Sequence, residues 1–281
     1  MNSTEVMELP LRDISESIAQ GKIIPYLGPD CFLLDPTVCG FPVTQEALAT
    51  QMTNKVSVPQ KLRRNLTAAC QFIENFKHRK TVVKLMNEAF SPGSPPNALH
   101  HFVAALDKKP LLIVDSWYDD TLARTFTGRA HWGQIQGNSQ SEHFGQWVSY
   151  FDCQGVAVDA SEAESWDTVL YKPLGSVSPA ANYIVSDSDF VEVLTEIDIQ
   201  TPIPARVQEL RVNSNFLFLG CRFDHQLNRS YARQIMKRSS DRHWAVIDGD
   251  LSRMEQRFLV EQHITRIDMP LATFLETLLP A

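Results

Sequence analysis

The sequence has little that would place the protein in a membrane or in a disulfide-bonded class. No apolar run approaches the roughly 20 residues that a membrane-spanning helix needs. The five cysteines are an odd number, are scattered and form no C-x-x-C pair, which argues against a disulfide framework and a zinc ribbon. Reduced cysteines packed as small apolar side chains in a cytoplasmic protein explain this pattern better.

Positive charge is also scarce, since the formal net charge is -7. Binding to a nucleic-acid backbone needs clustered lysine and arginine, so this balance argues against nucleic acid as the main partner. The N-terminal stretch "MNSTEVMELPLRD" lacks the apolar segment of an export signal. Basic residues concentrate in one place, where a solvated helix face or a contact for an acidic partner would explain them: Arg222, Arg229, Arg233, Lys237 and Arg238, with Arg242 just beyond.

Short apolar runs that alternate with helical patterns dominate the rest of the chain. The runs at 23–27, 111–114, 167–172, 215–219, 243–248 and 263–268 predict strands. This alternation predicts an α/β fold, a Rossmann-like, doubly wound and mostly parallel sheet. We expect a single domain over residues 1–281, with a helical insertion at about 44–100 and a loop-rich segment at about 128–165. In such a sheet, ligands bind beyond the carboxyl ends of the strands, near the point where strand order reverses.

The stretch 131–155 is rich in aromatic residues although its sequence is typical of loops. Trp132, Phe144, Trp147, Tyr150 and Phe151 lie within it. Two interpretations stand equally: a patch that faces a partner, or a lid folded over the cleft.

Six short motifs follow one another in an order that is typical of a known family. They are "IIPYLGPDCF", "CGFPVTQEAL", "HFVAAL", "VDSWYDDTL", "KPLGS" and "GCRFDHQL". Over nearly its whole length the chain resembles the SIR2-like, sirtuin-related domains that are common in prokaryotic proteins. The resemblance implies a Rossmann-like fold with a cleft for NAD.

Two positions depart from the pattern that the resemblance implies for members that cleave NAD. In those members an Asn of the fourth motif and a His of the fifth are associated with catalysis, because breaking the nicotinamide–ribose bond requires an oriented oxygen and a base. The aligned residues here are Trp117 and Leu174. Leucine has no proton-accepting atom, and the indole nitrogen only donates a hydrogen bond. The motifs are therefore degenerate, and we predict no catalytic residue at these positions.

The resemblance also indicates where a nucleotide would contact the chain. The candidate cofactor-binding residues are Gly28, Asp30, Ser116, Asp119, Gly175, Ser176, Gly220, Arg222 and Asp248. Pro29 has no N–H to offer a phosphate, and the Asp30 carboxylate would weaken phosphate binding. NAD or ADP-ribose stay open as cofactors. For Asp119, capping of the helix that follows is a better explanation than cofactor binding. For Asp248, a turn explains the residue as well as cofactor binding does. The histidines show no metal-like spacing, so no metal site is predicted.

Three functional hypotheses follow from these features. The first is a pseudoenzyme that acts through a protein partner, with self-association into a homo-oligomer left open. The second is an NAD glycohydrolase with displaced residues, drawn from Asp115, Asp119, His101, His131 and His143. The third is a sensor that binds NAD or ADP-ribose without cleaving it. A protein deacylase fits less well, because the zinc-ribbon cysteines of sirtuins are absent. The balance of these features favours a protein without enzymatic activity.

Overall fold

The computed structural model describes residues 3–196 and 203–278, so the ends of the predicted domain and the segment 197–202 lie outside it. The strands are β1 (Ile23–Leu27), β2 (Leu111–Asp115), β3 (Trp132–Gly137), β4 (Val148–Asp152), β5 (Ala157–Val158), β6 (Thr168–Lys172), β7 (Gly175–Ser176), β8 (Asn182–Tyr183), β9 (Asn215–Leu219), β10 (His243–Val246) and β11 (Ile264–Ile267). The helices are α1 (Ser3–Ala19), α2 (Gln45–Lys55), α3 (Leu66–Lys77), α4 (Arg79–Phe90), α5 (Ala98–Ala104), α6 (Thr121–Thr125), α7 (Asp187–Glu196), α8 (Ala205–Leu210), α9 (Gln226–Met236), α10 (Arg253–Glu261) and α11 (Leu271–Leu278), with 3-10 turns η1 (Pro29–Leu34), η2 (Gln60–Leu62) and η3 (Ala160–Ser165). None of the described helices is long and apolar enough to cross a lipid bilayer.

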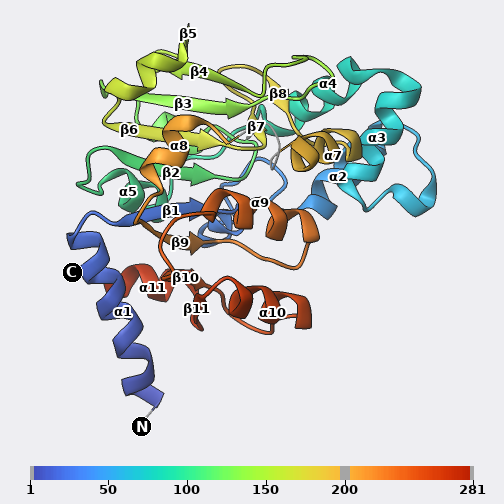
Figure 1. Cartoon of the computed structure of the whole chain (residues 1–281). Helices are drawn as coiled ribbons and strands as arrows, with labels where there is room; N and C mark the ends of the chain where they lie inside the picture. Colours follow the sequence, from blue (N-terminus) through green and yellow to red (C-terminus); the bar gives the residue numbers. More distant parts are fainter. Residues whose placement is uncertain (1–2, 197–202, 279–281) are drawn as a thin grey trace.

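Nine strands form one mixed sheet in the order β11-β10-β9-β1-β2-β6-β3-β4-β5 (Figure 1). Pairing is parallel from β11 to β3 and antiparallel from β3 to β5. The chain proceeds from β1 toward β2 on one side, and β9, β10 and β11 fill the other side. The strand order therefore reverses between β1 and β9, and the predicted Rossmann-like α/β fold is confirmed.

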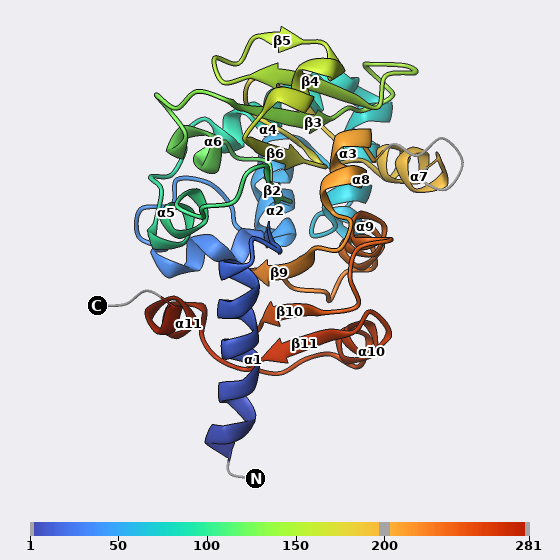
Figure 2. The same cartoon turned by 60° about the vertical axis from the view of Figure 1, so that its left-hand side comes forward.

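Helices cover both faces of the sheet, which explains the continuous apolar runs of its central strands. Every residue of β1, β2 and β9 is buried. Figure 2 shows α5, α6 and α11 on one face, with α8, α9 and α10 on the other. Pro25 is tolerated inside central β1 although it has no N–H. The pairing of β1 with β2 begins only after Pro25, at Tyr26.

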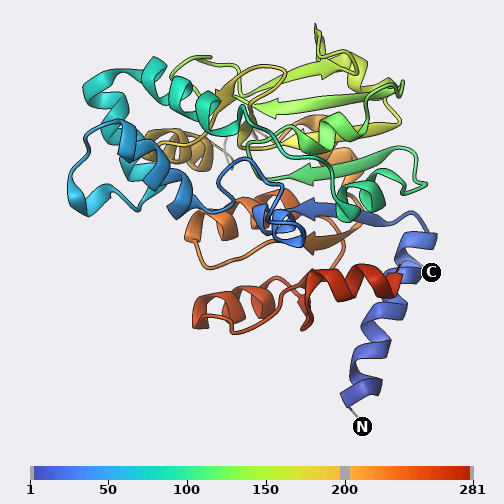
Figure 3. The same cartoon turned by 180° about the vertical axis from the view of Figure 1, so that it is seen from behind.

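The segment at about 44–100, predicted as a helical insertion, contains α2, α3, α4 and the start of α5. Figures 1 and 3 show α2, α3 and α4 together beyond the carboxyl ends of the parallel strands. Thr44 and Asn65 cap α2 and α3 through their side-chain oxygens. The apolar faces of these helices bury Leu48, Cys70 and Met86. The start of α2, at one end of this insertion, lines the cleft described below.

The segment at about 128–165, predicted as loop-rich, contains β3, β4, β5 and η3 between its loops. The buried strand β3 carries Gln134 and Gln136, whose polarity conceals the strand in the sequence. Gln134 Nε2 donates to the carbonyl of Ser178 at 2.9 Å, and Gln136 Nε2 donates to the carbonyl of Ala180. These bonds satisfy the amides in the interior, so the strand needs no apolar pattern.

Candidate functional site

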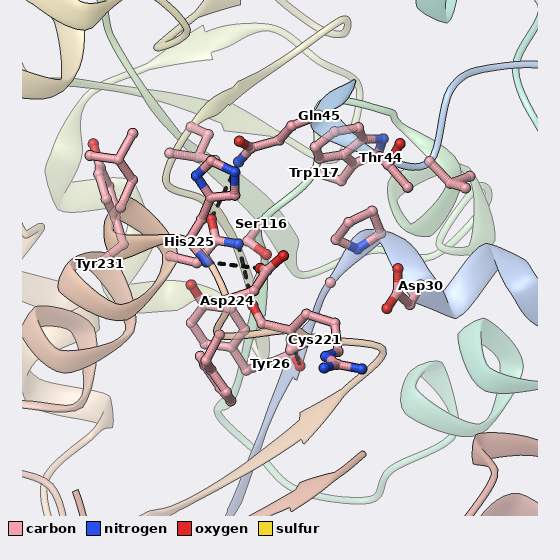
Figure 4. A pocket seen from close by; sticks show the side chains of 18 of the residues that line it. Tyr26, Asp30, Thr44, Gln45, Ser116, Trp117, Cys221, Asp224, His225 and Tyr231 are labelled. Carbon is pink, nitrogen blue, oxygen red and sulfur yellow. Dashed lines mark hydrogen bonds between the residues drawn. The ribbon is translucent and has the colours of Figure 1, made fainter. Parts of the chain in front are cut away.

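A cavity of about 440 Å³ opens at the carboxyl ends of the strands, where the strand order reverses. This is the expected position of a ligand site in a doubly wound sheet. Five segments line it: the end of β1 with the loop after it, the start of α2, the loop after β2, Phe190 of α7, and the loop after β9 with the start of α9. Leu174, from the turn after β6, completes the lining. Figure 4 shows His225 and Trp117 on different sides of this space, with Ser116 between them.

The loops after β1 and β9 are joined by backbone contacts at the floor of the cavity. Gly28 N–H donates to the carbonyl of Leu219 at 3.0 Å, and Asp30 N–H donates to the carbonyl of Gly220 at 3.0 Å. A Cβ on Gly28 would lie 2.3 Å from the oxygen of Gly220. These glycines therefore allow the two loops to approach each other. The amides of Gly28 and Asp30 are engaged and cannot cradle a phosphate.

Trp117 and Leu174, the residues at the two altered motif positions, both line the cavity. Their side chains are mostly buried, at 3% and 7% exposure. Trp117 Nε1 donates to the carbonyl of Pro42 at 3.1 Å, which joins the loop after β2 to the segment before α2. The indole also packs edge-on against Phe90. These two side chains therefore form an apolar part of the cavity wall.

A buried ion pair lies at the ends of β2 and β6. Lys172 Nζ lies 2.7 Å from Asp115 Oδ2, with the lysine side chain 1% and the aspartate side chain 10% exposed. Desolvation raises the pKa of Asp115 to about 6, although Lys172 opposes the shift. Asp115 Oδ1 also accepts from Trp117 N–H at 3.2 Å. Asp115 does not line the cavity, and its contacts hold the loop that carries Trp117.

The remaining candidates near these strands are divided between the cavity and the interior. Ser116 lines the cavity, and its Oγ donates to the carbonyl of Leu27 at 2.8 Å. Asp119, Gly175 and Ser176 are buried and do not line it. Asp119 Oδ2 accepts from Thr121 N–H, the first amide of α6, at 2.8 Å, although the residue at the N-cap position is Asp120. Ser176 Oγ donates to the carbonyl of Asp119 at 3.0 Å, so these residues shape the turn behind the cavity.

Arg222 lines the cavity, but its charge is already compensated. The guanidinium makes two bonds to Glu255, from Nε at 2.9 Å and from Nη2 at 3.1 Å. Glu255 is 1% exposed, and Arg222 Nη2 also donates to the carbonyl of Asp250 at 2.9 Å. The predicted ribose ligand Asp248 is exposed and lies outside the cavity.

Sequence reasoning missed a histidine that does line the cavity. His225 is the N-cap residue of α9, and Asn228 lies in the first turn of that helix; both line the cavity. Asn228 Oδ1 accepts a long bond of 3.5 Å from Gln45 Nε2 of α2. The motif "GCRFDHQL" contains His225 at a strand-to-helix turn, and that position was the available signal. None of His101, His131 and His143 lines the cavity.

Three carboxylates line the cavity, those of Asp30, Glu46 and Asp224, and Glu46 is paired with Arg64 at 3.3 Å. Desolvation raises the pKa of Asp30, Arg222 opposes the shift and Asp224 adds to it. No group of three His, Cys, Asp or Glu suited to a metal ion occurs among residues 3–196 and 203–278. The cavity thus combines apolar walls, amide and imidazole groups, and a negative rim.

Apart from Arg222, the residues of the basic concentration lie outside the cavity, and so does the aromatic stretch. Arg233 pairs with Glu261 at 3.6 Å and Arg242 pairs with Asp13 at 2.9 Å, so part of the basic concentration forms surface ion pairs. In the aromatic stretch, Trp132 and Phe151 are buried, whereas Phe144 is 96% exposed. No aromatic residue of 131–155 lines the cavity.

A comparison with protein families finds that the model of the SIR2-like domain matches residues 111–267. No curated protein matches the chain. The matched region runs from β2 to β11 and includes Trp117, Leu174 and Gly220. A domain of this kind indicates an NAD-related function. Because the match covers more than half of the 281 residues, the protein belongs to the SIR2-like domain family.

Proposed function

We propose that this protein is a catalytically degenerate SIR2-like protein that does not cleave NAD and acts through contacts with a protein partner. The observation that carries the proposal is the pair of residues Trp117 and Leu174, which line the cavity without an atom able to accept a proton from water. Bond cleavage at the nicotinamide ribose would need such an atom near the attacking oxygen.

The phosphate-binding features of the cleft support the same proposal. The amides of Gly28 and Asp30 are engaged by β9 and the loop after it, and Arg222 is bound to Glu255. A pyrophosphate would meet Asp30 and Asp224 instead of free N–H groups or an available guanidinium. These contacts also argue against a sensor of NAD or ADP-ribose.

Two exposed aromatic side chains support contacts with a protein partner. Phe144 and Phe76 expose 96% and 67% of their surface and offer apolar area to such a partner. All five cysteines are free thiols, which fits the cytoplasmic location that we propose.

A nicotinamide-release assay tests the proposal. Pure protein incubated with millimolar NAD should release no more nicotinamide than buffer does. Release that disappears in a cavity variant such as Ser116→Ala would overturn the proposal, because contamination would not respond to that substitution.

His225 supports a second candidate function, an NAD glycohydrolase with a displaced base. Its imidazole faces the cavity, and neutral imidazole is an effective general base. In that case His225→Gln abolishes nicotinamide release, whereas the matched variant His143→Gln, outside the cavity, retains it. Equal release from both variants would exclude His225 as the base.

A further inference from the structure

We propose that the contact between α7 and the helical insertion tightens when Glu192 takes up a proton. The helix α7 packs against α3 of the insertion (Figure 1). It also carries Phe190, which lines the cavity, so this contact helps to position part of the lining. The inference does not depend on the proposed function, because it concerns a contact outside the cavity and holds whether or not NAD is cleaved.

Three carboxylates already share one guanidinium at this contact. Arg79 Nη1 lies 2.8 Å from Asp189 Oδ2 and 3.4 Å from Glu74 Oε2. Arg79 Nε lies 3.0 Å from Glu142 Oε2, and Arg79 Nη2 donates to the carbonyl of Tyr183. Every nitrogen of the guanidinium is therefore engaged, and its single positive charge is outnumbered by the carboxylates around it.

Glu192 is a fourth carboxylate at the same place and lacks a cation of its own. It follows Asp189 by three residues on α7, so the two side chains lie on one helix face. Glu192 Oε2 is buried and has no hydrogen-bond partner within residues 3–196 and 203–278. Desolvation raises the pKa of Glu192, the charges of Asp189 and Glu74 raise it further, and Arg79 opposes the shift.

The neighbouring carboxylate of Asp189 differs, because donors satisfy both of its oxygens. Asp189 Oδ2 accepts from the N–H groups of Val185 and Ser186 at 2.9 Å each, and Oδ1 accepts from Ser139 Oγ at 2.6 Å. A buried carboxylate oxygen without a donor is unfavourable in its ionised form, and a proton relieves it. The proton therefore goes to Glu192, and its uptake removes repulsion between α7 and α3.

Urea unfolding of the full chain at pH 7, 6 and 5 tests this inference with Glu192→Gln, which is neutral at every pH. Because the pKa of Glu192 is raised by folding, its ionised form lowers stability at pH 7, and this effect fades as pH falls. The midpoint of the variant should exceed that of the wild type by about 0.3 M urea at pH 7 and by about half as much at pH 5. Glu276→Gln, an exposed carboxylate of α11, is the matched control and should follow the wild type at each pH.

Hydrogen exchange of backbone amides at pH 7 shows whether the gain lies in α7. Exchange of the α7 amides should be about fivefold slower in Glu192→Gln than in the wild type, whereas the amides of α11 should be unchanged. Three outcomes would overturn the inference: no gain in midpoint at pH 7, a gain of the same size at pH 5, or exchange that slows equally in α7 and α11. Nicotinamide release reports only on the proposed function, so the two failures are distinguishable.

Discussion

The indole of Trp117 and the side chain of Leu174 give the cavity an apolar part of its wall. Trp117 also has a structural role, since its N–H bonds to Pro42 and its ring packs on Phe90. Lys172 and Asp115 form a buried ion pair close by. At the scale of single residues, these contacts hold the loop after β2 in place.

The ion pair of Lys172 and Asp115 gives the first prediction. Lys172→Met should lower the free energy of unfolding by about 3–5 kcal/mol, because it leaves a buried carboxylate without its cation. Urea denaturation at pH 7 measures the change. Lys109→Met, which removes an exposed pair with Asp167, is the control and should change stability little. A loss no larger than that of the control would show that Asp115 is satisfied without Lys172.

At the scale of elements, the contact between the loops after β1 and β9 depends on glycine. Gly220 has φ +66° and a Cβ there would lie 2.3 Å from Cys31 N, whereas Gly249 has φ +77° with no atom within 4 Å. Gly220→Ala should therefore cost about 3 kcal/mol or more, from strain and overlap together. Gly249→Ala should cost about 1–2 kcal/mol from backbone strain alone. Equal unfolding midpoints in urea for the two variants would contradict the role of close packing.

Arg79, the first residue of α4, ties the helical insertion to the rest of the molecule. Its guanidinium contacts Asp189 at 2.8 Å, Glu142 at 3.0 Å and Glu74 at 3.4 Å, and it donates to the carbonyl of Tyr183. The Asp189 side chain is 0% exposed.

Loss of the ion pairs of Arg79 should loosen the attachment of the insertion, whose first helix α2 lines the cavity with its start. We expect Arg79→Met to lower the free energy of unfolding by about 3–5 kcal/mol, since Asp189 would be buried without a cation. Thermal and urea unfolding measure the loss. Arg12→Met, which removes an exposed pair with Glu16, is the control. A similar small effect in both variants would mean that the clamp is dispensable.

For the whole molecule, two buried histidines set a dependence of stability on pH. Desolvation lowers the pKa of His100 and of His243 to about 4. His243 Nδ1 accepts from Phe216 N–H at 3.0 Å, a bond that protonation of this nitrogen would break. The unfolded chain binds these protons near pH 6.5. The stabilisation is therefore complete above pH 6.5 and is lost as pH falls toward 4.

A comparison of variants separates the contribution of His243 from that of groups such as Asp115, whose raised pKa changes stability in the opposite direction as pH falls. Between pH 7 and pH 5 the free energy of unfolding should fall by about 2 kcal/mol less in His243→Gln than in the wild type. Urea titrations at both pH values measure this difference. The exposed control His101→Gln should retain the full decrease. A parallel pH profile in His243→Gln and wild type would exclude His243 as a source of the dependence.

Local apolar pattern was enough to predict β1, β2, β6 and β9 and the Rossmann-like sheet, because strands buried on both faces are apolar throughout. The order of motifs was enough to indicate the SIR2-like family and to locate Trp117 and Leu174. Tertiary structure alone revealed β3, whose Gln134 and Gln136 are satisfied by carbonyls more than 40 residues away. It also decided that Arg222 binds Glu255, that Asp119 lies outside the cavity and that His225 lines it. These outcomes depend on which segments the sheet order brings together, and no local pattern in a sequence encodes such partners.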